Sequence, residues 1–433
     1  MQINRNKYLN QLISKKENGL IKIVTGIRRS GKSYLLFELY HKYLVENEGV
    51  DEDCIIEISL DDLANIKYRN PFELDKFIRE KIEKEDNLYY VFIDEIQMVE
   101  SVDNPYVTDG RKKITFVDVL LGLIKMKNVD LYITGSNSKM LSSDILTEFR
   151  GRGDEIKMAP LSYRELYDCF DNKNNAWKEY VTYGGMPYLV SLTNHQSKSK
   201  YLIDLFNKIY LEDIVERNKI SASKETLSDL LNLIATAVGL LTNPLKLSKT
   251  FKSVKQITIT SATISKYLDY FIDSFLISKS YRYDVKGKRY LDTPLKYYYS
   301  DIGLRNAMLN FRQQEENHIM ENIIYNELIG RGFNVDVGVV EYNYKDENGL
   351  SKRKQFEIDF VANQASKRYY IQSALSIVDE EKKNQEVQSL LRVDDSFKKI
   401  VIVKDDIIPW HDENGILFIG VENFLLNDAI IDY

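Results

Sequence analysis

Residues 26–33 follow the pattern G-x-x-x-x-G-K-S, and their types and spacing indicate phosphate chemistry. Glycines in such a loop let the backbone wrap tightly and aim N–H groups at phosphate oxygens. Lys32 can reach the β- and γ-phosphates, and the Ser33 hydroxyl can ligate Mg²⁺. The alternative is a chance match in a glycine turn. The candidate cofactors are ATP and Mg²⁺, and the candidate phosphate-binding residues are Gly26, Ile27, Arg28, Arg29, Ser30, Gly31, Lys32 and Ser33.

An acidic pair, Asp94-Glu95, follows the continuous apolar run of residues 88–93. Such a run is typical of a strand buried on both faces of a parallel sheet. Asp94 stands where a second Mg²⁺ ligand is needed, and Glu95 where a base can polarise the attacking water. The alternative is a solvated acidic pair at a strand end. The phosphate loop upstream favours the catalytic interpretation.

Polar and basic residues follow a third predicted strand within 129–141. At its tip, Asn137 or Ser136 can touch the γ-phosphate or its water, although Ser136 can equally be the N-cap of a helix. Arg150 and Arg152 are candidates for an arginine finger that stabilises charge on a neighbouring subunit's nucleotide. An exposed basic turn is the alternative. A working finger would require a homo-oligomer.

The elements that must position the phosphate-loop residues are predicted in the order strand, loop and helix. Ile23 and Val24 close a short apolar strand before the loop, and residues 33–44 continue with apolar residues at helical spacing. With the strand at 88–93, this order predicts an α/β fold with a parallel sheet core. The apolar content of 44% allows a core in each domain, and the net charge of −6 argues against nucleic-acid coating along the whole chain.

The length of the chain, its cysteines and its apolar segments limit its possible organisation. We expect two or three domains in 433 residues. Cys54 and Cys169 lack metal-type spacing, which predicts a reduced, cytoplasmic protein. The first residues show no apolar h-region, so we expect no secretory signal. No run of about 18 apolar residues occurs in the sequence, so we expect no membrane partner.

The order of GIRRSGKS, VFIDEIQ, ITGSNS and FRGRG…APLSYREL resembles a large family of bacterial and archaeal AAA-type ATPases. That family pairs an N-terminal P-loop domain with a C-terminal domain of unknown function. YGGMPYLV (183–190) and YLEDIVERNKI (210–220) also match, so the resemblance covers nearly the whole chain. It implies an ATPase core over residues 1–158 and a helical lid segment over 159–223. Arg217 is either a second trans-acting arginine or half of an ion pair on a helix surface.

Residues 224–300 have the order helix, helix, helix and hairpin, which predicts a winged-helix-like segment. Its third helix would begin near Ser261, and its hairpin would turn at Gly287. Double-stranded DNA is a candidate partner through residues 261–289. The alternative is a joint between domains or a surface for a protein partner. The residues that would contact DNA are Ser265, Lys266, Tyr267, Arg282, Lys286, Lys288 and Arg289.

Residues 301–433 resemble a restriction-endonuclease-like α/β domain. Active members place an Asp at the end of one strand and E/Q-x-K on the next, where the carboxylates hold Mg²⁺ and the Lys positions the water. Asp359 and Gln372 match this pattern, but the Lys position is Ala374. The helix acid would be Glu321 or Glu327, and Glu357 lies on the same strand as Asp359. We therefore predict a fold without efficient cleavage.

Three functions follow from these features. The first is a Mg²⁺-dependent ATPase that controls conformation or partner binding. The second is a nucleotide-gated DNA- or protein-binding module with little turnover. The third is an ATP-dependent nuclease, against which Ala374 argues. Glu95 favours turnover over a pure switch, because binding alone needs no base.

Overall fold

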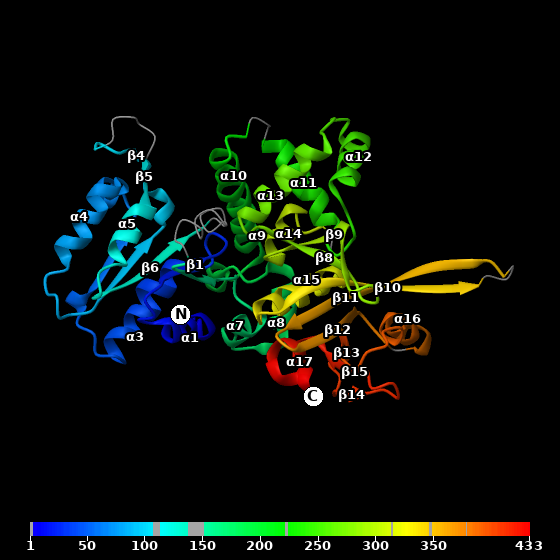
Figure 1. Ribbon diagram of the computed structural model, residues 1–433. Coiled ribbons are helices and arrows are strands. Elements are labelled where there is room, and N and C mark those ends of the chain that lie inside the picture. The colour runs from blue at the N-terminus through cyan, green and yellow to red at the C-terminus, as the bar shows by residue number, and fades with distance from the viewer. Residues whose placement is uncertain are drawn as a thin grey trace. The chain divides into compact units, whose positions relative to one another are not determined.

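The computed structural model describes residues 3–106, 113–136, 151–220, 224–312, 315–345, 349–377 and 379–433 (Figure 1). The chain divides into two compact units. The first comprises residues 1–160 with 273–275, and the second comprises 161–272 with 276–433. The first unit holds a five-stranded sheet and the second an eight-stranded sheet, each with its own helices. The α/β class expected from the sequence is confirmed.

The sheet of the first unit is parallel throughout, with the order β2-β3-β6-β1-β7. β1 and β3 are buried along their whole length, as the continuous apolar runs predict. β6, the fourth strand of this sheet in chain order, lies between β1 and β3, so the tips of all three meet at one edge. The strands are β1 (Ile21–Thr25), β2 (Ile55–Ser59), β3 (Tyr89–Asp94), β6 (Val129–Gly135) and β7 (Gly153–Lys157).

Helices cover both faces of this sheet. One core cluster includes Leu74 and Leu120, from α4 (Pro71–Lys81) and α5 (Phe116–Leu123). The other includes Leu12 from α1 and Leu36 from the helix after the phosphate loop. The remaining elements are α1 (Asn6–Lys15), α2 (Lys32–Tyr34) running through a π-helical turn (Leu35–Tyr40) into α3 (His41–Glu46), and the short pair β4 (Val102–Asp103) and β5 (Lys113–Ile114).

The first part of the second unit is helical, and the YGGMPYLV motif packs tightly within it. A Cβ on Gly185 would lie 2.0 Å from the Leu161 carbonyl oxygen, and one on Gly184 would lie 2.3 Å from Asp301 Oδ1. The motif is therefore a close-packed joint. The helices are α7 (Tyr163–Asp168), α8 (Ala176–Tyr183), α9 (His195–Asp204), α10 (Leu211–Arg217), α11 (Lys224–Thr236), α12 (Pro244–Lys255), α13 (Ser261–Asp273) and α14 (Ile302–Met308).

The large sheet of the second unit has the order β14-β15-β13-β12-β11-β10-β8-β9. Its strands are β8 (Ile277–Asp284), β9 (Arg289–Tyr299), β10 (Asn334–Lys345), β11 (Ser351–Gln364), β12 (Lys367–Ala374), β13 (Lys398–Val403), β14 (Trp410–His411) and β15 (Leu417–Gly420). Its helices are α15 (Glu316–Gly330), α16 (Glu380–Leu391) and α17 (Val421–Leu426). The hairpin predicted as a wing is β8–β9, and it joins this sheet because β8 pairs with β10.

Among the described helices, none combines the length and the apolar character that crossing a bilayer requires.

Candidate functional site

The loop after β1 is shaped by left-handed backbone conformations. Gly26 has φ 139°, and a Cβ there would lie 2.0 Å from the Met158 carbonyl oxygen, so only glycine fits. Arg29 and Gly31 also have positive φ, of 64° and 95°. Left-handed residues within a turn direct successive N–H groups into a concavity that suits an anion. The loop therefore has the backbone of a phosphate cradle.

Polar side chains of the loop are buried within it. Lys32 is only 4% exposed, and its Nζ donates to the carbonyl oxygens of Gly26 and Ile27, each at 3.2 Å. Ser30 is fully buried, and its hydroxyl has no hydrogen-bond partner among the described residues. A buried polar group without a partner is uncommon in proteins. The loop thus offers a lysine and a spare hydroxyl to a ligand.

The two candidate metal ligands lie in direct contact. Ser33 Oγ donates to Asp94 Oδ2 at 2.8 Å, which brings the start of the helix to the tip of β3. Ser59 Oγ, at the end of β2, lies 3.3 Å from the same oxygen and donates to Asp61 Oδ1 at 2.6 Å. A hydroxyl and a carboxylate are hard oxygen ligands of the kind Mg²⁺ prefers, so this donor set fits the ion. Ser59 was missed by the sequence analysis, because a lone serine at a strand end carries no motif.

Glu95 is held by three neighbours, which come from β6, from the residue after β6 and from the turn that follows β3. Its backbone has φ 52°, and its N–H donates to Thr134 Oγ1 at 2.9 Å. Its carboxylate accepts hydrogen bonds from Gln97 Nε2 and from Ser136 Oγ, the latter at 3.3 Å. Thr134 and Gln97 were not predicted. Ser136 was one of two residues expected at this tip, and the other, Asn137, lies outside the described residues.

The candidate arginine fingers fall at different places. Arg150 lies outside the described residues. Arg152 is exposed and precedes β7, where its carbonyl oxygen accepts a hydrogen bond from the N–H of Ile21 at 2.8 Å. Since β1 and β7 are parallel, this is the edge of the sheet opposite the phosphate loop, roughly 16 Å away for strands of this length. Arg217 belongs to α10, and its side chain lies outside the described residues.

The basic residues proposed for DNA are partly engaged within the second unit. Arg282 donates to Gln355 at 3.4 Å, Arg289 pairs with Asp284 at 3.4 Å, and Lys286 lies 3.9 Å from Asp394. On α13, Lys266 lies over the Tyr270 ring. The β8–β9 hairpin is paired within a sheet, and two of its basic side chains contact acidic residues of the same unit. These side chains are therefore less available to bind DNA phosphates.

The second unit contains a buried ionic cluster that the sequence did not predict. Lys296 of β9 is 1% exposed, and its ammonium lies 2.8 Å from Glu321, 2.7 Å from Glu357 and 3.5 Å from Asp359. The nuclease pattern expects a lysine on the strand that contains Ala374, whereas this lysine comes from β9. Of the two candidate helix acids, Glu321 belongs to the cluster. Glu327 pairs instead with Arg331 at 2.7 Å.

Burial and mutual charge shift the titration of this cluster. Burial first, and then the Glu321 charge, raise the pKa of Asp359 to about 7. Burial alone would lower the pKa of Lys296, but the surrounding carboxylates raise it above the usual value. Asp359 Oδ2 also accepts the Ser373 N–H at 2.9 Å, beyond the last β11–β12 pair, Phe360–Ile371. In the described part of the chain, no three acidic, His or Cys side chains are arranged to hold a metal ion.

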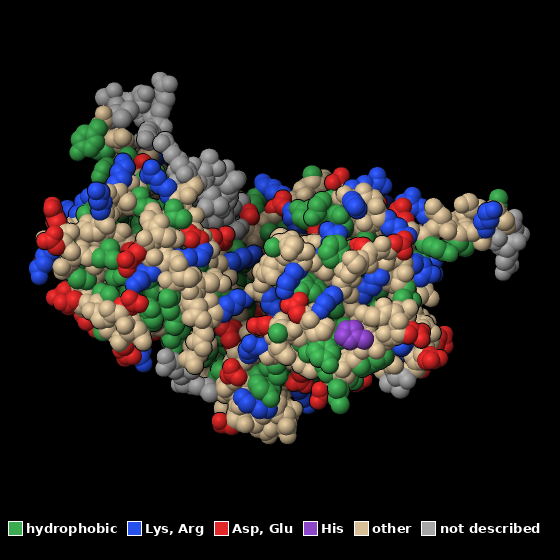
Figure 2. All heavy atoms as spheres, turned by 60° about the horizontal axis from the view of Figure 1, so that its bottom comes forward, with side chains coloured by type: hydrophobic (Ala, Val, Ile, Leu, Met, Phe, Trp, Pro, Cys, Tyr) green, Lys and Arg blue, Asp and Glu red, His purple; other side chains and the backbone are tan. Residues whose placement is uncertain are grey.

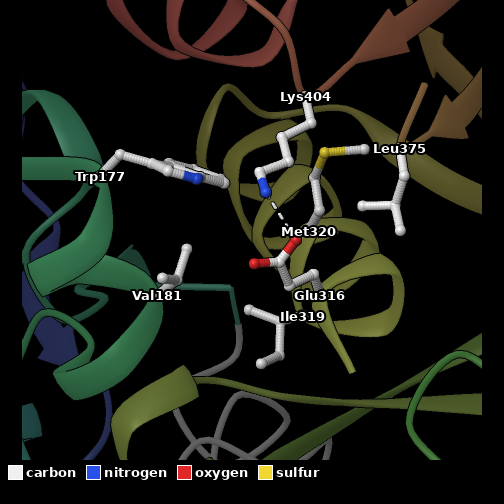
Figure 3. A pocket seen from close by; sticks show the side chains of 7 residues that line it. All are labelled: Trp177, Val181, Glu316, Ile319, Met320, Leu375 and Lys404. Atoms are coloured by element: carbon white, nitrogen blue, oxygen red, sulfur yellow. Dashed lines mark hydrogen bonds and ion pairs between the residues drawn. The ribbon is translucent and has the colours of Figure 1, made fainter. Parts of the chain in front are cut away.

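A pocket lies between α8 and α15 of the second unit (Figure 3). Its two charged residues, Lys404 and Glu316, pair with each other at 2.6 Å, and the other lining residues are apolar. The lining residues are Trp177, Val181, Glu316, Ile319, Met320, Leu375 and Lys404.

Two family models match successive parts of the chain. A model of the AAA domain matches residues 18–167, and a model described as a domain of unknown function, DUF8612, matches residues 174–315. An uncharacterised protein of Haemophilus influenzae is 34% identical over 406 residues, which span 92% of this chain and 93% of that protein. An uncharacterised protein of Methanocaldococcus jannaschii is 29% identical and covers 79% of this chain and 71% of its own.

Two solved structures show distant likeness. A Walker-type ATPase of Pyrococcus abyssi covers 71% of this chain and 96% of its own, at 16% identity and a TM-score of 0.45. The Orc1 protein of Aeropyrum pernix, solved in complex with DNA, covers 72% of this chain and 93% of its own, at 11% identity and a TM-score of 0.32.

Proposed function

The chain belongs to the same family as the uncharacterised Haemophilus influenzae protein and carries an AAA domain, and from this premise we propose that its first unit is a Mg²⁺-dependent ATPase. ATP binding and hydrolysis would control the conformation of the chain or its binding to a partner. The observation that carries the proposal is the 2.8 Å contact between Ser33 Oγ and Asp94 Oδ2. It joins the phosphate loop to the acidic strand end, which is the pairing that magnesium-nucleotide chemistry needs.

Each residue of the site has a role in this proposal. The loop N–H groups and Lys32 would bind the β- and γ-phosphates. Ser33 and Asp94 would hold Mg²⁺, which neutralises charge on the phosphate oxygens when bound. Glu95 would accept a proton from the water that attacks the γ-phosphorus, as the bond to the β,γ-bridging oxygen breaks and ADP leaves. Thr134 would keep Asp94 and Glu95 in register with each other.

ATP hydrolysis by purified full-length variants tests the proposal. Lys32→Ala removes the phosphate contact and should abolish ATP binding or turnover. Glu95→Gln keeps the shape but removes the base, so ATP should still bind while turnover falls roughly 100-fold or more. Lys42→Ala, on the exposed surface of α3, is the control and should leave both unchanged. Turnover by Glu95→Gln at the wild-type rate would refute the assignment of the base.

A binding switch with little turnover predicts a different result from the same assay. ATP would then bind the wild-type protein with Mg²⁺, yet hydrolysis would be equally slow in wild-type and Glu95→Gln protein. Adding double-stranded DNA separates the partner classes. Stimulation by DNA would support contact through residues 261–289, and indifference to DNA would favour a protein partner.

An arginine finger in trans requires subunits to share a site. Arg152 lies at the sheet edge away from its own phosphate loop, so any action on a nucleotide would have to be on a neighbour's. Arg152→Ala and Glu95→Gln should each be inactive alone. Mixed together, they should regain part of the activity, because some interfaces would combine an intact Arg152 with an intact Glu95. No recovery on mixing would remove Arg152 from the site.

Phosphodiester cleavage by the second unit is a second candidate, favoured by one observation. Lys296 supplies the buried lysine that the strand of Ala374 lacks, next to Glu357 and Asp359. Against cleavage, its ammonium already contacts these carboxylates and offsets part of their negative charge. We expect no nicking of plasmid DNA with Mg²⁺ or Mn²⁺. Nicking that Asp359→Ala abolishes would establish a nuclease.

A further inference from the structure

β10 and β11 extend past their other partners to form a two-stranded arm. β10 pairs with β8 only over 337–339, and β11 pairs with β12 only over 360–364. Residues 340–345 and 351–356, here called the arm, therefore pair only with each other. Figure 1 shows the arm projecting from the sheet of the second unit. Most of its residues are exposed on both faces.

One face of the arm gathers aromatic and basic side chains. Tyr342 lies opposite Lys354, and Tyr344 lies opposite Lys352. Opposed residues of an antiparallel pair point to the same side, so these four share a face. Phe356 continues this face toward the sheet, and Arg392, at the end of α16, lies over it. We call Tyr342, Tyr344, Lys352, Lys354, Phe356 and Arg392 the arm face.

The two tyrosine rings form parallel, exposed platforms. Their planes differ by 8°, and their centroids lie 6.3 Å apart. Tyr342 is 41% exposed and Tyr344 is 39% exposed. Exposed parallel rings of this kind are surfaces on which flat bases can stack.

Two cations of the arm face, Arg392 and Lys354, lie over its rings. Arg392 lies 4.9 Å from the Tyr342 centroid and 4.2 Å from that of Phe356, while Lys354 lies 4.8 Å from the Phe356 centroid. The opposite face differs, because Arg353 there pairs with Glu341. Figure 2 shows blue basic and green apolar side chains together along the projecting arm.

Protection against edge pairing explains only part of this pattern. Lysines on exposed strands prevent association with other chains. That purpose does not call for two large aromatic rings exposed on the same face, since these add apolar surface for association. A two-stranded ribbon with both faces in water is also marginally stable by itself. A ligand that covers the rings and neutralises the cations accounts for both features.

We propose that the arm face binds single-stranded nucleic acid, with bases stacked on Tyr342 and Tyr344 and phosphates beside Lys352, Lys354 and Arg392. Alternating rings and cations are what a strand of flat bases on a charged backbone requires. A duplex keeps its bases stacked on each other and unavailable to these rings. The site is separate from residues 261–289 and does not depend on ATP hydrolysis.

Fluorescence anisotropy of the full-length protein with labelled oligothymidylate of about 15 nucleotides tests this proposal. Wild-type protein should bind with a slope of log affinity against log salt near −2, since about three cations meet phosphates. Tyr342→Ala and Tyr344→Ala should each weaken binding about tenfold, and Lys354→Gln should weaken it and flatten the slope. Oligouridylate in parallel shows whether DNA or RNA is preferred.

Arg353→Gln is the matched control, because it removes one positive charge from the opposite face of the same arm. It should bind like the wild type. Far-ultraviolet circular dichroism and the melting temperature check that each variant folds. Equal losses for Arg353→Gln and Lys354→Gln would overturn the proposal in favour of unspecific charge. So would unchanged binding by the tyrosine variants, no binding to either oligonucleotide, or stronger binding to duplex DNA or anionic vesicles.

Discussion

Thr134 Oγ1 donates a hydrogen bond to Asp94 Oδ1 at 2.5 Å, across the neighbouring strands β6 and β3. The same oxygen accepts the N–H of Glu95 at 2.9 Å. One buried hydroxyl thus fixes both the carboxylate proposed to hold Mg²⁺ and the backbone of the proposed base. Because β6 is inserted between β1 and β3, this contact depends on the strand order, which no single motif in the sequence reveals.

Thr134→Val should damage the site while keeping its volume. Valine can neither donate to Asp94 nor accept from the Glu95 N–H, so two buried polar groups lose a partner. We expect the free energy of unfolding to fall by about 1–3 kcal/mol and ATP turnover to fall with it. Thr134→Ser retains the hydroxyl and should keep most of both. Urea unfolding and ATPase assays on the two variants decide this, and equal behaviour of valine and serine would count against the role of the hydroxyl.

Gln97→Leu should separate orientation of the base from nucleotide binding. Gln97 bonds the Glu95 carboxylate and also donates to Ser136 Oγ at 3.2 Å. Without this support the carboxylate is free to rotate away from the water, and misplacement of this kind costs roughly 10- to 100-fold in rate. We expect kcat to fall while KM for ATP stays near the wild-type value. A matching rise in KM would instead mean that Gln97 contributes to nucleotide binding.

The sequence predicted those parts of the fold and site that depend on local pattern. The apolar run before Asp94 identified a buried parallel strand, and the loop pattern placed Lys32 and Ser33 at the start of a helix. These residues have neighbours in sequence that reveal their context. Ser33 and Asp94 were expected at one site because both belong to motifs of one chemistry, and their side chains lie in contact.

The parts that sequence analysis missed depend on contacts between distant segments. Lys296 reaches Glu321 and Asp359 only because β9, α15 and β11 meet in one core. Thr134 is a common residue in a strand and becomes informative only when β6 lies beside β3. The wing was predicted from the order of its elements, but order does not tell which other strand a hairpin will join. In the structure, the hairpin joins the large sheet through the pairing of β8 with β10.

Gly184→Ala should show that the YGGMPYLV motif is a packing joint. Gly184 combines φ 72° with ψ −157°, a conformation that is essentially restricted to glycine, and its added Cβ would meet Asp301. We expect a loss of more than about 3 kcal/mol in the free energy of unfolding, above the roughly 1–2 kcal/mol of a left-handed alanine alone. Gly415→Ala is the control, since it has φ 73° with open space around it. Equal losses of unfolding free energy in Gly184→Ala and Gly415→Ala would mean that backbone strain alone, and not the contact with Asp301, causes the effect.

Lys296→Met should destabilise the second unit in a pH-dependent way. Glu321 and Asp359 would remain buried without their cation, which typically costs about 3–5 kcal/mol when one member of a buried pair is removed. The pKa of Asp359, already raised to about 7 by burial, would rise further once Lys296 is gone. Lowering the pH therefore protonates the carboxyls and relieves the unpaired charge, so the stability deficit of the variant should shrink between about pH 8 and pH 5.5.

Lys404→Met is the comparison, because its pair with Glu316 is partly exposed and should be worth less than about 1 kcal/mol at either pH. Urea unfolding of the three proteins at both pH values measures the difference. A deficit for Lys296→Met that matched Lys404→Met, or that grew as the pH fell, would show that the carboxylates do not rely on Lys296 for their charge balance.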